Sequence, residues 1–377
     1  MSNLEQTKGT FKLIGKVVNI DRENAMTERT MDKGKNKGRE YRNLRFGIQT
    51  APDNMVQIGM FSFEPIEVYV WETENRKGGK MPYDKWKKNR KVLEKQKKIP
   101  LETAVGLERD EEGKTKTQHL PSWDAIAYIH DNLFNGDSVL VEGDISYNTY
   151  TNKAGQEVTS TNYNLKRLFA LKQPVDFQDK DFEETSVFTQ EFVFEGVELD
   201  EKEKKAVVFG KSIGYAREDQ IPPMTDVSFE ILFDEERDED GLMEKMAKTY
   251  AKKVPYGSLV TVHGNILNKA ISQVVESDED VDDDVMAMLG GERNRMETTI
   301  TYKRAMEIRG TDSLEREKYT EEDLSQDDSL IDNDDSDDDL GDLVGAKKSK
   351  SKIEENDFLD DDDNFDFDDM DDSDLPF

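Results

Sequence analysis

Residues 136–145 read GDSVLVEGDI, and residues 256–266 read YGSLVTVHGNI. Both stretches are rich in Val, Leu and Ile and begin next to a turn-forming glycine, as is typical of β-strands. The dipeptide Lys166-Arg167, downstream of the first stretch, has a counterpart in Lys303-Arg304, downstream of the second. This internal repeat predicts two copies of one small β domain.

A similar order of elements surrounds both stretches: strands, then a helix, then two more strands. In the first copy we expect strands at residues 11–20, 41–50 and 55–61, a helix at 123–134, and strands at 138–147 and 159–171. In the second copy we expect strands at 192–199 and 227–233, a helix at 242–253, and strands at 257–267 and 298–308. A five-stranded barrel with a helix between its third and fourth strands is the arrangement of the OB-fold, whose open face binds oligonucleotides. The predicted fold is therefore all-β with minor α, built from two tandem OB-fold barrels.

Three parts of the chain follow from this prediction. The first barrel takes residues 1–175, with an insertion at about 64–121, and the second takes residues 186–310, with acidic loops. Residues 311–377 form an acidic tail of low hydrophobicity with repeated Asp and Ser and no periodicity. Such a composition is typical of disorder. We therefore expect two folded domains followed by a disordered tail.

The net charge of −32 is unevenly distributed. Residues 1–173 carry 29 Lys and Arg against 24 Asp and Glu, or +5, residues 174–310 carry 17 against 32, or −15, and residues 311–377 carry 6 against 28, or −22. Affinity for nucleic-acid phosphates normally comes from Lys and Arg. The overall acidity argues against a polyanion as ligand, whereas the basic first unit is compatible with one.

The composition also excludes several classes of protein. The sequence has no cysteine, so it can form neither a disulfide framework nor a thiolate zinc site. No apolar run approaches the roughly 20 residues of a membrane-spanning helix, and the N-terminus lacks a signal-peptide pattern. We therefore expect a cytoplasmic protein with no membrane partner.

Three segments match one known family in that family's own order. Lys12 to Val17 comes first, Val139 to Gly143 then leads through Tyr150 to Gly155-Gln156-Glu157, and an acidic tip ends the chain. These segments resemble the bacterial single-stranded DNA-binding protein family, which has a V-x-V-E-G strand, an aromatic residue, a polar turn with G-Q-E and an acidic C-terminal tip. The second barrel and the insertion depart from the common bacterial form. They suggest a divergent bacteriophage member, which would act in the cytoplasm of a bacterial host.

The resemblance implies a protein that binds single-stranded DNA without sequence preference, and that coats and protects it in DNA replication, recombination and repair. Such binding needs cations that follow the phosphates and rings on which bases stack. Tyr150 occupies the position of a base-stacking aromatic in that family. The other candidates for the groove lie on the second and third strands and on the hairpin: Tyr41, Arg45, Phe61, Tyr147, Lys153, Tyr163, Lys166 and Arg167. The alternative for any one ring is that it closes an end of the barrel core.

The insertion supplies most of the positive charge of the first barrel. Residues 76–98 carry 11 Lys and Arg against two acidic residues, with aromatic residues set among them. Such a mixture suits a flexible arm that closes over a DNA strand. The candidates for DNA contact in this arm are Trp86, Lys87, Lys88 and Arg90. The alternative is a solvated helical excursion without a role in binding.

The C-terminal tip combines a ring with a terminal carboxylate, and capture of such a terminus is a known mode of recognition. Its residues are Asp374, Leu375, Pro376 and Phe377. We expect this tip to recruit replication and repair proteins of the polymerase, helicase, primase or recombinase classes. Self-association of the chain stays open.

The second barrel gives a weaker signal for DNA binding. Its acidic loops at 234–240 and 276–284 would repel phosphates if they lay beside a groove. We expect residues 302–304 to contribute weakly to binding, or the domain to serve mainly in assembly.

The sequence carries no enzymatic signature. It has no G-x-x-x-x-G-K-[ST] loop, and His119, His130 and His263 lack metal-ligand spacing. We expect no catalytic residues, no metal and no cofactor. Two alternatives stay open. One is an acidic interaction protein or DNA mimic that binds a replication or repair enzyme without binding DNA, and the other is a nuclease built on carboxylates and magnesium.

Overall fold

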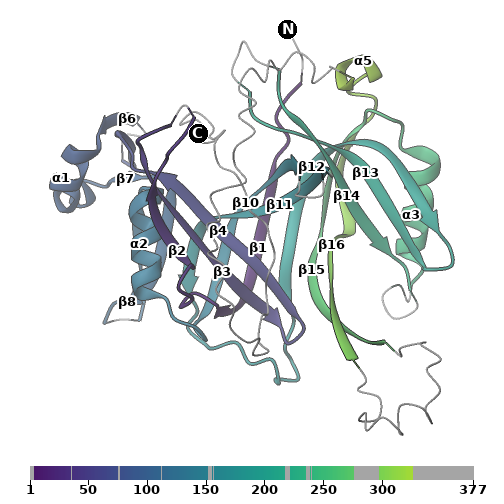
Figure 1. Ribbon diagram of the computed structural model, residues 1–377, viewed down its shortest axis with the longest axis horizontal. Helices are drawn as coiled ribbons and strands as arrows, with labels where there is room; N and C mark the ends of the chain where they lie inside the picture. The colour runs from purple at the N-terminus through teal and green to yellow at the C-terminus, as the bar shows by residue number, and fades with distance from the viewer. Residues whose placement is uncertain are drawn as a thin grey trace, which may run out of the picture.

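The protein is mostly β, with few helices (Figure 1). The computed structural model describes residues 4–34, 36–74, 77–111, 113–151, 155, 157–216, 221–234, 238, 240–275 and 297–325, and the side chains of all these except 270–275 and 297–303. Within these residues, thirteen strands join in one large mixed sheet and three form a second, small sheet. None of the described helices has the length and apolarity needed to span a membrane.

The first half of the structure (residues 4–170) contains a closed circuit of five strands. They are β1 (Gly9–Val18), β3 (Glu40–Ala51), β4 (Asn54–Phe63), β10 (Ser138–Thr151) and β11 (Glu157–Ala170). β1 pairs with β3 and β10, β3 pairs with β4, β10 pairs with β11, and β11 meets β4 in parallel. Helix α2 (Ser122–Asn132) lies between β4 and β10 in the chain, and β2 (Met26–Thr30) is added beside β3.

The second half (residues 185–325) repeats this circuit. Its strands are β12 (Thr185–Asp200), β13 (Lys205–Ile213), β14 (Met224–Leu232), β15 (Leu259–Val275) and β16 (Glu297–Glu315). β12 pairs with β13 and β15, β13 with β14, β15 with β16, and β14 meets β16 in parallel. Helix α3 (Leu242–Lys253) lies between β14 and β15 in the chain. The internal repeat in the sequence therefore corresponds to a repeat in strand pairing.

The insertion is folded and does not form a loose arm. Its elements are β5 (Glu67–Glu72), β6 (Lys77–Pro82), α1 (Tyr83–Lys95), β7 (Lys98–Pro100), β8 (Thr103–Arg109) and β9 (Thr115–Leu120). β6, β5 and β7 make the small sheet, and β8 and β9 extend the large sheet beyond β11. The expectation of a flexible arm is therefore corrected: α1 is docked at the outer end of the first half (Figure 1).

The core follows the alternation predicted from the sequence. Leu44, Phe46 and Ile48 on β3 are buried, and Phe46 and Ile48 stand opposite Ile58 and Val56 on β4. Burying such apolar side chains contributes about 25 cal/mol per Å² of surface removed from water. The strands predicted at residues 41–50 and 55–61 are confirmed, whereas β13 was not predicted.

Both repeats have a glycine at the same position, and the same steric constraint requires it in each. Gly143 on β10 and Gly264 on β15 each follow a register shift in the strand pairing. A Cβ atom at Gly143 would collide with the carbonyl oxygen of Asn164, and one at Gly264 would collide with that of Glu307. Only a residue without a side chain permits this close approach of the partner strand. The glycine therefore marks the same bulge in both halves.

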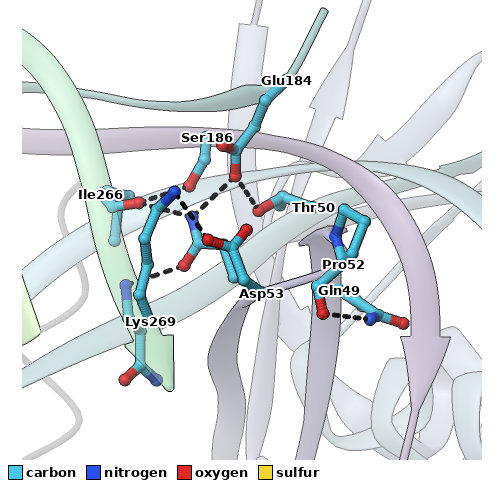
Figure 2. Close-up of polar contacts among 10 residues, drawn as sticks. Gln49, Thr50, Pro52, Asp53, Glu184, Ser186, Ile266 and Lys269 are labelled. Atoms are coloured by element: carbon cyan, nitrogen blue, oxygen red, sulfur yellow. Dashed lines mark hydrogen bonds and ion pairs between the residues drawn. The ribbon is translucent and has the colours of Figure 1, made fainter. Parts of the chain in front are cut away.

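The two halves are joined by backbone pairing and by a partly buried polar cluster. β12 pairs with β1 along one edge and with β15 along the other. At the same junction, Asn54 donates to Glu184 and to the carbonyl of Ile266. The Ile266 carbonyl also accepts from Ser186 (Figure 2). The predicted barrels are therefore not separate sheets, because both circuits belong to one continuous sheet.

The folded part is longer than predicted. Tyr319 and Leu324 are buried against Leu4 and Ile213, and α5 (Glu321–Leu324) follows the end of β16. The predicted start of the disordered tail at residue 311 is therefore wrong, since the sequence of this region is acidic but includes apolar anchors. Residues 326–377 lie outside the described part of the chain.

Candidate nucleic-acid interface

A cleft of about 460 Å³ lies between the two halves. Its walls come from β3, β4, β10 and β11 of the first half and from β13 to β16 of the second. Four residues predicted to bind DNA line it, together with one arginine of the second half: Arg45, Phe61, Tyr147, Tyr163 and Arg304. The fold thus assembles a site from segments far apart in the sequence.

The outer face of β3 and β4 carries rings and a cation. Alternation turns Leu44 and Phe46 into the core, so Tyr41 and Arg45 on β3 point to the opposite face. The ring of Tyr41 lies 5.5 Å from that of Phe61 on β4, with an angle of 33° between the two planes. All three side chains on this face are half-buried, so each keeps an accessible surface.

Tyr147 and Tyr163 form a wall of the cleft. The hydroxyl of Tyr147 donates to Gln190 Oε1 at 3.1 Å, and the ring of Tyr163 meets Phe11 edge-on at 5.4 Å between centroids. Burial raises the pKa of both tyrosines well above the ordinary value of a tyrosine side chain. Arg304 partly opposes this shift in the pKa of Tyr163, which means that its charge acts across the cleft. Both rings are held firmly and serve better as a wall than as mobile stacking partners.

The charges around the cleft are mixed. Arg45 and Arg304 contribute positive charge, and Asp226 and Glu230 on β14 contribute negative charge. Lys211 Nζ lies 2.6 Å from Asp226 Oδ1, so that carboxylate is compensated within the protein. A phosphate chain would therefore be attracted on the β3 side of the cleft and repelled near Glu230.

Two amide groups of the cleft offer further hydrogen bonds. Asn43 and Asn162 line it, and within the described structure Asn43 Oδ1 and Asn162 Nδ2 have no hydrogen-bond partner. Buried polar atoms are nearly always paired, so such atoms are available to a ligand or to water. They provide one acceptor and one donor for the polar groups of a ligand.

Lys166 and Arg167 lie elsewhere. They line a second cavity of about 750 Å³ with Lys12 and Glu142. Arg167 Nη1 lies 3.5 Å from Glu142 Oε2, and Lys166 Nζ lies 3.9 Å from Asp144 Oδ2. These cations therefore do not contribute to the cleft between the halves.

The residues predicted on α1 divide into two groups. Lys87 and Lys88 are exposed, whereas Trp86 is only 2% exposed and stacks on Tyr83 in the core. Base stacking on Trp86 is therefore incompatible with the structure. Arg90 donates to Glu94 and Gln118, which fixes it on the protein.

The spacing of residues in the sequence indicates which face of α1 is buried. Tyr83, Trp86, Arg90 and Leu93 follow one another at spacings of three, four and three residues. This is the spacing of one helix face. It could have shown that Trp86 points inward.

The remaining residues predicted to bind DNA or a partner lie outside the cleft or outside the described residues. Tyr150 is half-buried near the end of β10, opposite Val158. Lys153 and the tip residues Asp374, Leu375, Pro376 and Phe377 lie outside the described residues. In the part of the chain that is described, no group of three or more His, Asp and Glu side chains could hold a metal ion.

Comparisons with known proteins place the chain in a family. No curated protein matches it. The structure matches that of a deletion mutant of the single-stranded DNA binding protein from Thermus aquaticus with a TM-score of 0.32 and 11% identity, over 85% of this chain and 100% of that one. The profile of the YorF family matches residues 8–337, which is most of the sequence, and this protein therefore belongs to the YorF family.

Proposed function

We propose that this protein binds single-stranded DNA without sequence preference, through the cleft and the outer face of β3 and β4. The observation that carries this proposal is the grouping of Tyr41, Phe61 and Arg45 on one accessible sheet face that leads into the cleft. Stacked bases and a tracked phosphate chain need this combination of rings and cations. The coating and protection of DNA during replication, recombination and repair would follow from such binding.

We also propose that each half is an OB-type barrel within the shared sheet. Counting only the circuit strands, both halves have the order 1-2-3-5-4, with a helix between the third and fourth strands. In OB-folds the face of strands 2 and 3 binds oligonucleotides. In the first half these strands are β3 and β4, which carry the rings and Arg45.

We propose binding and not catalysis, because rings, amides and guanidinium groups make up much of the polar and aromatic lining of the cleft, and one of its carboxylates, Asp226, is paired with Lys211. The recruitment of replication and repair proteins by residues 374–377 stays a prediction. Deleting those four residues should leave DNA affinity unchanged or raise it, and should remove binding to a partner. Unchanged partner binding would contradict that role.

Fluorescence anisotropy of labelled oligo-dT, at low and high salt, tests the proposed function on the full chain. We expect salt-sensitive binding without cleavage of the oligonucleotide, weakened in the double variant Arg45→Ala/Phe61→Ala. Tyr215→Ala is the control, because Tyr215 is exposed but does not line the cleft. Failure of the unaltered protein to bind would favour an acidic interaction protein, and magnesium-dependent shortening of the oligonucleotide would favour a nuclease.

A further inference from the structure

Helix α1 is a rigid part of the first half. The Tyr83 hydroxyl donates to Asp124 Oδ1 on α2 at 2.9 Å, and the rings of Tyr83 and Trp86 stack 6.0 Å apart. Leu93 is also buried, so the inner face of the helix is held over its whole length. The outward face of α1 is therefore presented in a fixed position.

That outward face is strongly basic. Its five lysines, all exposed, form what we call the lysine face: Lys85, Lys87, Lys88, Lys91 and Lys95. Within the described chain none of the five lies within ion-pair distance of a carboxylate, whereas the neighbouring Lys97 and Lys98 pair with Glu74 and Glu72. Three of the five recur at every fourth residue, which places them in a row with steps of about 6 Å along the helix. Such uncompensated charge on a fixed surface attracts a polyanion.

The lysine face follows directly on the aromatic face of the candidate site. The ring of Phe63, at the end of β4, lies 5.1 Å from the ring of Phe61. Three residues further on, the Ile66 carbonyl accepts a hydrogen bond from the backbone N–H of Tyr83, the first residue of α1. The helix thus begins beside the end of the strand that carries the rings. Figure 1 shows α1 at the outer end of the first half and α3 at the opposite end of the molecule.

We propose that the lysine face is a second contact for the nucleic acid, binding the phosphates of the part of the strand that leaves the cleft beyond Phe63. This inference rests on the proposed function of the cleft. It changes the role expected of the insertion, since α1 binds by charge from a fixed position and does not close over the strand. The ligand is a single-stranded phosphodiester chain, recognised without reading its bases.

The acidic tail of the chain is the main competitor for this surface. Residues 326–377 carry 22 Asp and Glu against 4 Lys. The position of α1 beside the aromatic face favours nucleic acid, because an oligonucleotide bound on Tyr41 and Phe61 extends toward the helix. Binding of a synthetic peptide of residues 354–377 shows whether the tail also binds the lysine face.

The test compares the full chain with the triple variant Lys87→Ala/Lys91→Ala/Lys95→Ala, in which alanine preserves the helix. Labelled oligo-dT of about 8 and about 40 nucleotides is used, since one OB-fold covers roughly 4 to 16 nucleotides. The short oligonucleotide should bind both proteins equally. For the long one, the loss of three contacts should reduce the salt slope by about 2, so that the unaltered protein loses roughly 20-fold more affinity than the variant between 50 and 200 mM salt.

The matched control is Lys245→Ala/Lys252→Ala/Lys253→Ala on α3, which removes the same charge from exposed lysines of the second half. Equal binding of the long oligonucleotide by the α1 variant and the unaltered protein would overturn the inference. An equal loss of affinity of the α1 variant for the short and the long oligonucleotide would also overturn it. The same holds if the α1 variant loses affinity only for a synthetic peptide of residues 354–377. No binding of either oligonucleotide by the unaltered protein would instead refute the proposed function.

Discussion

Asn54 Nδ2 lies 2.7 Å from Glu184 Oε1, which joins the turn between β3 and β4 to the segment that enters β12. The same amide nitrogen donates to the Ile266 carbonyl at 3.0 Å, and Thr50 Oγ1 also donates to Glu184, at 2.6 Å (Figure 2). Asn54 is 1% exposed. One buried side chain therefore connects three segments that are distant in sequence, and it fixes the two halves on either side of the cleft.

Replacing Asn54 with Ala should lower the free energy of unfolding by roughly 2 to 3 kcal/mol, because the buried Ile266 carbonyl would lose a donor and the Asn268 backbone N–H would lose its acceptor. Urea denaturation measures this change. Gln49→Ala is the control, since Gln49 donates to the Pro52 carbonyl in an exposed position (Figure 2). Gln49→Ala should lower the free energy of unfolding by less than about 0.5 kcal/mol. Equal effects of the two substitutions would show that the cluster does not brace the junction.

Gly143→Ala and Gly264→Ala should each destabilise the protein by more than about 1 kcal/mol, because the new Cβ would collide with the backbone of the partner strand. Gly196→Ala, also within a strand, is the matched control, as a Cβ there meets nothing within 4 Å. Thermal denaturation of the three variants gives the comparison. A tolerated alanine at both repeat positions would refute the steric explanation of the shared glycine.

Stability should fall steeply in strong base. Burial raises the pKa of Tyr147 and Tyr163 in the folded protein, so the unfolded chain releases these protons first. The stability that they contribute is present below about pH 10 and is lost as the pH rises above it. Two such groups add about 2.7 kcal/mol per pH unit to the slope once the unfolded chain is ionised.

Urea denaturation between pH 8 and 11 checks this, since Tyr147→Phe/Tyr163→Phe should flatten the slope whatever its effect at neutral pH. Tyr215→Phe, at an exposed position, should leave the slope unchanged. A double variant with the slope of the unaltered protein would speak against buried, protonated tyrosines.

Phe61→Ala should weaken binding of oligo-dT roughly 5- to 150-fold, because one base stack is worth about 1 to 3 kcal/mol. Trp86→Phe should instead lower the free energy of unfolding and leave the affinity within about twofold, since Trp86 lies in the core. Anisotropy and urea denaturation on both variants separate the two effects. A large loss of affinity in Trp86→Phe at unchanged stability would contradict the assignment of that ring to the core.

Strand prediction succeeded where one face of a strand is buried. Leu44, Phe46 and Ile48 alternate with polar residues, and this pattern is local to β3. β13 was missed because Val207, Val208 and Phe209 are consecutive apolar residues without that alternation. The mixture of basic and aromatic residues in α1 does not by itself indicate whether the aromatic rings point outward or inward.

The sequence by itself determined the repeat, the order of those strands and helices whose apolar residues follow a local periodicity, and the outward position of Tyr41 and Arg45. Only the tertiary structure decided that Arg45 and Arg304 line one cleft and that Lys166 lies outside it. Such placements depend on pairing between β1 and β12 and on the contacts of Asn54. The physical reason is that no local pattern encodes contacts between residues more than a hundred positions apart.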